Sequence, residues 1–133
     1  MKGEMVEWED PVTGEIHKCP KSFMAVRHII GYGEWSAMHA GMLLAKLGKP
    51  NTQPNQRHLR KAVFILRGQG EPIVSTRSKI GGYYIASTYE ELDQHCTIQE
   101  KLAQSMLEGV MRLRSRWIKP TPPDNFPHQL RLL

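Results

Sequence analysis

The sequence has no long hydrophobic run and only two cysteines. No apolar stretch reaches the roughly 18–20 residues that a transmembrane helix needs, and the acidic N-terminus lacks the order of a secretory signal peptide. Cys19 and Cys96 lie far apart in the sequence, so separate thiols are expected, with a disulfide left open. His17 and His28 are spaced too loosely around Cys19 to predict a zinc site. We therefore expect a cytoplasmic protein without membrane association, metal or cofactor.

Recognisable catalytic motifs are also missing. The serines do not lie in a nucleophile elbow, and there is no glycine-rich strand-to-helix loop of the Walker type. Glu90, Glu91 and Asp93 fall at the start of an expected helix, where the helix dipole explains acidic residues without catalysis. The sequence therefore does not predict an enzyme.

Acidic residues are scarce in the middle of the chain. Residues 49–87 contain seven Lys or Arg against Glu71 alone, whereas residues 1–16 and 88–108 each carry a net charge of −4. A basic block of this kind indicates a polyanionic partner, and a basic surface kept for solubility is the alternative.

The N-terminal part, residues 1–20, is expected to form an arm or a small hairpin. A turn at residues 10–14 separates two short segments with strand character, Met5–Trp8 and Glu15–Lys18. Pro11, Gly14 and Pro20 exclude a continuous helix in this stretch.

Two short helices should follow. Ser22 is a candidate N-cap for a helix that runs to Ile30, and Ser36 is a candidate N-cap for a second helix to Leu47. The apolar residues of both segments recur at helical spacing, and Gly48 is placed to end the second helix.

The third predicted helix has the clearest pattern. Asn51 or Thr52 would cap it, Pro54 would lie in its first turn, and glycines at 68 and 70 would end it. Its inward face is expected to consist of Leu59, Ala62, Val63 and Leu66.

A two-stranded hairpin is expected next. Residues 72–75 and 83–86 are rich in β-branched and aromatic residues, and the connection between them is basic and ends in two glycines. Three helices followed by such a hairpin predict an α+β, mainly α, winged helix-turn-helix domain over residues 21–87. A long helix over residues 88–117 and a proline-rich tail over residues 118–133 complete the expected organisation.

This architecture predicts sequence-specific binding to double-stranded DNA. The second helix of the turn motif fits the major groove, where Arg pairs with guanine and Asn or Gln pairs with adenine, and a basic hairpin tip meets phosphates. Winged helices also serve as protein-docking modules, and this alternative stays open. The candidate DNA-binding residues are Asn55, Gln56, Arg57, Arg60, Lys61, Arg67, Arg77 and Lys79.

Three stretches resemble small winged helix proteins of bacteriophages and prophages. They are LRKAVFILRGQGEPIVS at residues 59–75, GGYYIAS at 81–87 and the acidic EEL at 90–92, followed by a long helix that ends in arginines. The sequence departs from that pattern in a longer turn at residues 49–53. The resemblance implies DNA binding in phage transcription regulation or replication, inside a bacterial host cell.

The long C-terminal helix has one apolar face along its whole length. Such a face either packs on the winged domain or binds a partner, most simply a second copy of the chain. The tail or this helix could also bind another protein. The candidate dimerisation residues are Leu102, Met106, Val110 and Leu113.

Overall fold

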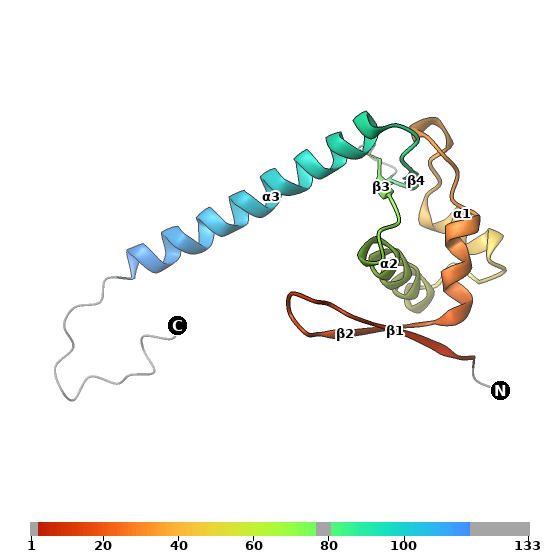
Figure 1. Cartoon of the computed structure of the whole chain (residues 1–133). Helices are drawn as coiled ribbons and strands as arrows, with labels where there is room; N and C mark the ends of the chain where they lie inside the picture. Colours follow the sequence, from red (N-terminus) through yellow and green to blue (C-terminus); the bar gives the residue numbers. More distant parts are fainter. Residues whose placement is uncertain (1–2, 77–80, 118–133) are drawn as a thin grey trace. The chain divides into compact units, whose positions relative to one another are not determined.

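The structure, a computed structural model, describes residues 3–76 and 81–117 (Figure 1). The chain divides into two units, Met1–His95 and Cys96–Leu133, and the described part of the second unit is the larger portion of one long helix with the residue after it. The fold is α+β, with more helix than strand and two separate two-stranded antiparallel sheets. Within the described residues, every helix is too short or too polar to cross a membrane.

The N-terminal segment forms the expected hairpin. Strand β1 (Met5–Glu9) pairs antiparallel with β2 (Ile16–Pro20). In the turn between them, the backbone N–H of Gly14 donates to the carbonyl of Asp10 at 2.8 Å, and Gly14 has a φ of 74° that favours glycine. The prediction of two short strands around this turn is confirmed.

The first helix differs from the prediction. It is a 3-10 helix, η1 (Lys21–His28), that buries Phe23 and Val26. Pro20 occupies the N-cap position and no side chain caps the helix, so the prediction that Ser22 is the cap is wrong. The reason is that β2 continues directly into η1, which places Ser22 inside the helix rather than before it.

The second helix begins later than predicted. Helix α1 spans Ala40–Lys46, and Nδ1 of His39 accepts the capping hydrogen bond from the N–H of Met42 at 3.3 Å. Ser36 instead ends a short 3-10 turn, η2 (Glu34–Ser36), and its hydroxyl donates to nearby backbone carbonyls. The backbone of Met38 pairs with Tyr83 of the following hairpin, and an α-helix that began at Ser36 would remove Met38 from that pairing.

The partner of that segment is the second hairpin, β3 (Ile73–Ser75) and β4 (Tyr83–Ile85). The backbone groups of Met38 and Tyr83 exchange two hydrogen bonds, of 3.1 and 2.9 Å. Ile85 is also bonded to residues 31 and 33 through its backbone. The predicted hairpin is confirmed, and two isolated bridges, one from Tyr32 to Ile85 and one from Met38 to Tyr83, join the preceding segment to β4.

Helix α2 (Gln53–Gly68) agrees with its prediction most closely. Thr52 is the N-cap, its hydroxyl oxygen accepting from the N–H of Asn55 at 3.3 Å, and Pro54 lies in the first turn. The four residues expected on the inward face are buried, together with Ile65. They pack with η1, α1, β2 and β3 in one hydrophobic core.

Helix α3 (Tyr89–Arg116) contains no buried residue. Its start is tied to the first unit by Glu91, whose carboxylate accepts from the backbone N–H groups of Ser87 and Glu34 at 2.7 and 3.1 Å. These bonds lower the pKa of Glu91 below its ordinary value, because they stabilise the carboxylate form.

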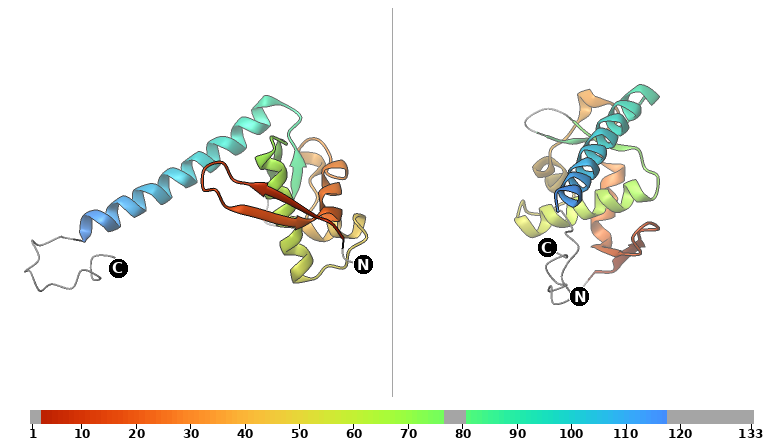
Figure 2. Two further views of the ribbon diagram at one scale, coloured as in Figure 1. Left: turned by 60° about the horizontal axis from the view of Figure 1, so that its bottom comes forward. Right: turned by 90° about the vertical axis from the view of Figure 1, so that its left-hand side faces the viewer.

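The β1–β2 hairpin lies along one side of α2, as Figures 1 and 2 both show. The rings of Trp8 and Phe64 meet edge to face at 5.8 Å, and His17 packs against Phe64 at 4.6 Å. A Cβ atom at Gly68 would lie 2.6 Å from Cη2 of Trp8, so only glycine fits beneath this ring. The hairpin is therefore a packed part of the first unit rather than a loose arm.

We expect Gly68→Ala to lower the free energy of unfolding by about 1–3 kcal/mol, because its methyl group overpacks the contact with Trp8. The sign is informative, since alanine is the better helix former by about 1 kcal/mol. Urea denaturation of the full chain measures the effect. In a Trp8→Ala background the same substitution should be neutral or stabilising, and an equal cost in both backgrounds would contradict the contact.

Candidate nucleic-acid interface

Helix α2 has a core face and one outer side. The hairpin covers the C-terminal part of the outer side at Lys61, Phe64 and Gly68, which lie three to seven residues apart. Arg57 lies four residues before Lys61 on this outer side, and Arg60, three residues after Arg57, is its neighbour on the helix surface. Among the described residues, Arg57 and Arg60 therefore form the N-terminal part of the outer side, before the part that the hairpin covers.

Arg57 and Arg60 are both exposed. Within residues 3–76 and 81–117, neither guanidinium has a hydrogen-bond or ion-pair partner. Each of the other DNA-binding candidates on this helix has a hydrogen-bond partner within the chain; they are Asn55, Gln56, Lys61 and Arg67. A guanidinium presents five donors in a planar fork, which suits a phosphate or the O6 and N7 acceptors of guanine. These two side chains are the centre of the candidate interface.

Asn55 and Gln56 are used locally. The amide of Asn55 donates to the carbonyl of Pro50 at 2.9 Å, and the amide of Gln56 donates to Oδ1 of Asn51 at 2.6 Å. Both bonds stabilise the turn between α1 and α2. Adenine recognition by these two amides, as predicted from the sequence, would compete with their hydrogen bonds in the turn.

Lys61 contacts the hairpin. Its Nζ lies 2.8 Å from Nδ1 of His17 and 5.7 Å from the centre of the Phe64 ring. Because an ammonium group only donates, Nδ1 of His17 is the acceptor and the ring proton lies on Nε2, which is 3.9 Å from the carboxylate of Glu15. The charge of Lys61 is thus already engaged within the chain.

Arg67 holds the second hairpin onto α2. Its Nε donates to the carbonyl of Ile73 at 2.6 Å and its Nη2 donates to the hydroxyl of Ser75 at 2.9 Å. The guanidinium also lies 5.9 Å from the centre of the Tyr83 ring. Burial lowers the pKa of Arg67, although an arginine stays charged at any ordinary pH. The prediction of a DNA contact competes here with a clear structural role.

The two hairpin-tip candidates, Arg77 and Lys79, lie outside the described residues. The four dimerisation candidates all lie on α3 and are exposed. Both sets of residues stay predictions from the sequence, and the structure describes only the dimerisation candidates.

Sequence analysis missed two exposed aromatic residues. Trp35 is 91% exposed and Tyr32 is 66% exposed, and both lie in the segment that pairs with β4. Hydrogen bonds from Ser36 and to Glu91 fix the backbone around them. The signal in the sequence was the glycine-flanked stretch at residues 31–35, where large side chains have no helical or strand period.

No group of three metal-ligating side chains comes together in the described part of the chain. Cys19 is buried and Cys96 exposed, and both are free thiols. Burial raises the pKa of the Cys19 thiol to about 11, against a smaller opposite effect of Lys61, so this sulfur is held in its unreactive form.

Comparison with protein-family models, with curated proteins and with solved structures finds no match for this chain. The resemblance to phage winged helix proteins therefore stays a prediction. The support for the candidate interface comes from the positions and contacts of its residues alone.

The role of Arg67 is testable by comparison with Arg60. Arg67→Met keeps the apolar stem but loses both bonds to β3, so we expect the free energy of unfolding to fall by about 1.5–3 kcal/mol. The matched change Arg60→Met removes an exposed charge and should stay within about 0.5 kcal/mol. Chemical denaturation measures both variants, and equal small effects would show that Arg67 does not hold the hairpin.

Proposed function

We propose that this protein binds double-stranded DNA sequence-specifically through a winged helix-turn-helix core. The order of elements supports the proposal: a helix, a strand-like segment, two helices and a two-stranded hairpin. The pairing of Met38 with Tyr83 brings the strand-like segment beside β4, as a winged helix requires. In this reading α1 and α2 are the turn motif and α2 is the recognition helix.

The observation that carries the proposal is the pair Arg57 and Arg60, whose guanidinium groups have no hydrogen-bond or ion-pair partner among the described residues. They lie in the N-terminal half of α2, the part of a recognition helix that contacts base edges. The neighbouring candidates Asn55, Gln56 and Lys61 are engaged within the chain. Readout through α2 is thus narrower than the sequence suggested, and it favours guanine over adenine.

The biological setting follows from the resemblance alone. Small winged helix proteins of phages and prophages imply a role in transcription regulation or replication, and that setting is part of the proposal. The scarcity of acids in residues 49–87 supports a polyanionic partner independently of any resemblance.

A protein-docking module is the second candidate function. Its specific support is the pair Tyr32 and Trp35, since aromatic residues held on a fixed backbone are typical of binding hot spots. Glu34 lies between Tyr32 and Trp35 in the sequence, and an acidic side chain at that position repels DNA. The aromatic pair therefore fits a protein partner better than a duplex.

The first experiment is selection from a random duplex pool, followed by fluorescence anisotropy at several salt concentrations. With the selected duplex, Arg57→Ala and Arg60→Ala should each weaken binding by about 1–3 kcal/mol and relax the preference at one position. Binding should also fall steeply with salt, because phosphate contacts release counterions.

Arg27→Ala is the matched control, because it removes one exposed arginine from η1, an element that does not enter the groove in this model of binding. Its effect should be small and uniform across sequences. Failure of the wild-type chain to bind any duplex at low salt would reject the DNA proposal. The test of Trp35→Ala against a captured partner protein would then address the docking alternative.

A further inference from the structure

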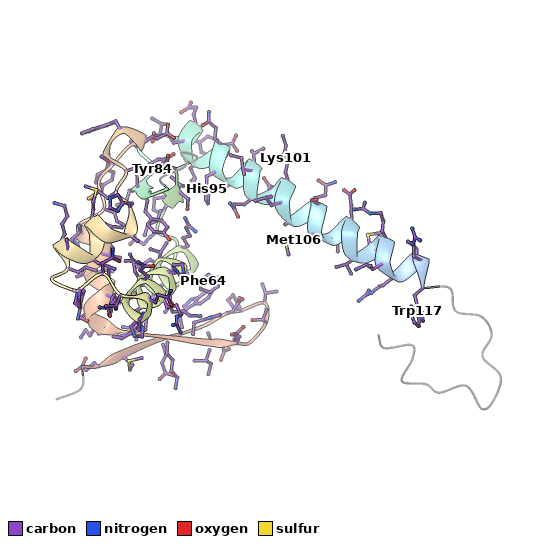
Figure 3. All side chains as sticks on the ribbon, turned by 180° about the vertical axis from the view of Figure 1, so that it is seen from behind. Phe64, Tyr84, His95, Lys101, Met106 and Trp117 are labelled. Atoms are coloured by element: carbon purple, nitrogen blue, oxygen red, sulfur yellow. The ribbon has the colours of Figure 1, made fainter. Side chains whose placement is uncertain are left out.

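Helix α3 carries an apolar stripe that is exposed in the described part of the chain. Leu102, Met106, Val110 and Leu113 recur every three or four residues, and Trp117 continues the series just after the helix. Met106 and Leu113 are 74% and 73% exposed. Met106 and Trp117 project from one side of the helix and Lys101 from the other (Figure 3). Single exposed apolar residues are common, but a continuous stripe of this kind marks an interface.

The charges of α3 are separated along its length. Residues 89–100 contain four acids (Glu90, Glu91, Asp93 and Glu100) and no Lys or Arg. Residues 101–117 contain four bases (Lys101, Arg112, Arg114 and Arg116) and only one acid, Glu108. Two such helices attract each other when they run antiparallel and repel each other at both ends when they run parallel.

Gly109 gives a second indication. It lies on the same side of the helix as Leu102 and Leu113, and glycine weakens the interior of a helix. Among the described residues, the only atom near a Cβ added there is the end of the Arg112 side chain, at 4.0 Å. Nothing described in this chain therefore requires glycine at this position, whereas a second helix lying across it would.

We infer that α3 binds α3 of a second copy of this chain in antiparallel orientation. A register centred on Gln104 places Leu102 of one copy against Met106 of the other, and Ile98 against Val110. The long side chain of Gln99 then lies over Gly109, and the acidic end of each helix faces the basic end of its partner. Parallel pairing and a different protein on the stripe are the competing outcomes of the test.

Sedimentation equilibrium of the full chain tests the interface without DNA, so its result does not depend on the proposed function. The wild-type chain should dimerise at micromolar concentration, and Met106→Asp should weaken the dimer at least tenfold. The variant should keep its helix content in circular dichroism, because Met106 is exposed in the single chain. A wild-type monomer, or a dimer that Met106→Asp leaves unchanged, would overturn the inference.

Charge reversal tests the orientation. Arg112→Glu, Arg114→Glu and Arg116→Glu together should weaken an antiparallel dimer about tenfold or more at low salt, because acids then face acids. Adding Glu90→Lys, Asp93→Lys and Glu100→Lys on the same chain should restore it. Glu91 is left unchanged because it holds the start of α3. A parallel dimer would tolerate the first reversal, because its two ends would still face like charges, and that result would overturn the orientation.

Discussion

The buried face of α2 is the contact on which the whole first unit depends. Helices η1 and α1 and strands β2 and β3 all pack against it. These elements are short, with seven residues in α1 and three in β3, and short helices and isolated hairpins are barely stable alone in water. The apolar residues of α2, fully shielded from solvent at Leu59, Ile65 and Leu66, supply the burial that holds them in place.

The same arrangement limits what α2 can bind. Lys61 contacts the β1–β2 hairpin through His17, and Arg67 donates a hydrogen bond to Ile73 of the second hairpin. Two residues of the basic helix therefore serve the fold, and the candidates without a partner among the described residues narrow to Arg57 and Arg60. Because most positions of α2 contact the core or one of the hairpins, few positions remain to contact a ligand. Any specificity of α2 would therefore depend on Arg57 and Arg60.

The sequence predicted the elements with strong local signals. These elements include the helical spacing of apolar residues in α2, its Thr52 cap and the turn at residues 10–14. Each could be predicted because it depends on residues close together in the chain. Ser22 and Ser36 were read as caps and are not, because strand pairing of adjacent segments overrode a local preference. The engagement of Lys61 by His17 joins residues 44 positions apart, and no periodicity reports such a contact.

The length of α3 links the proposed pairing to the proposed function. In a register centred on Gln104, the two copies of Tyr89 lie 30 residues apart along the pair, which is about 45 Å at 1.5 Å per residue. Each chain enters α3 from its own β4, so the two first units, which we propose bind DNA, would attach at opposite ends. A homodimer of either orientation has a two-fold axis and so fits a two-fold symmetric target. The orientation decides whether the two units lie at opposite ends of the helix pair, as in antiparallel pairing, or at the same end, as in parallel pairing.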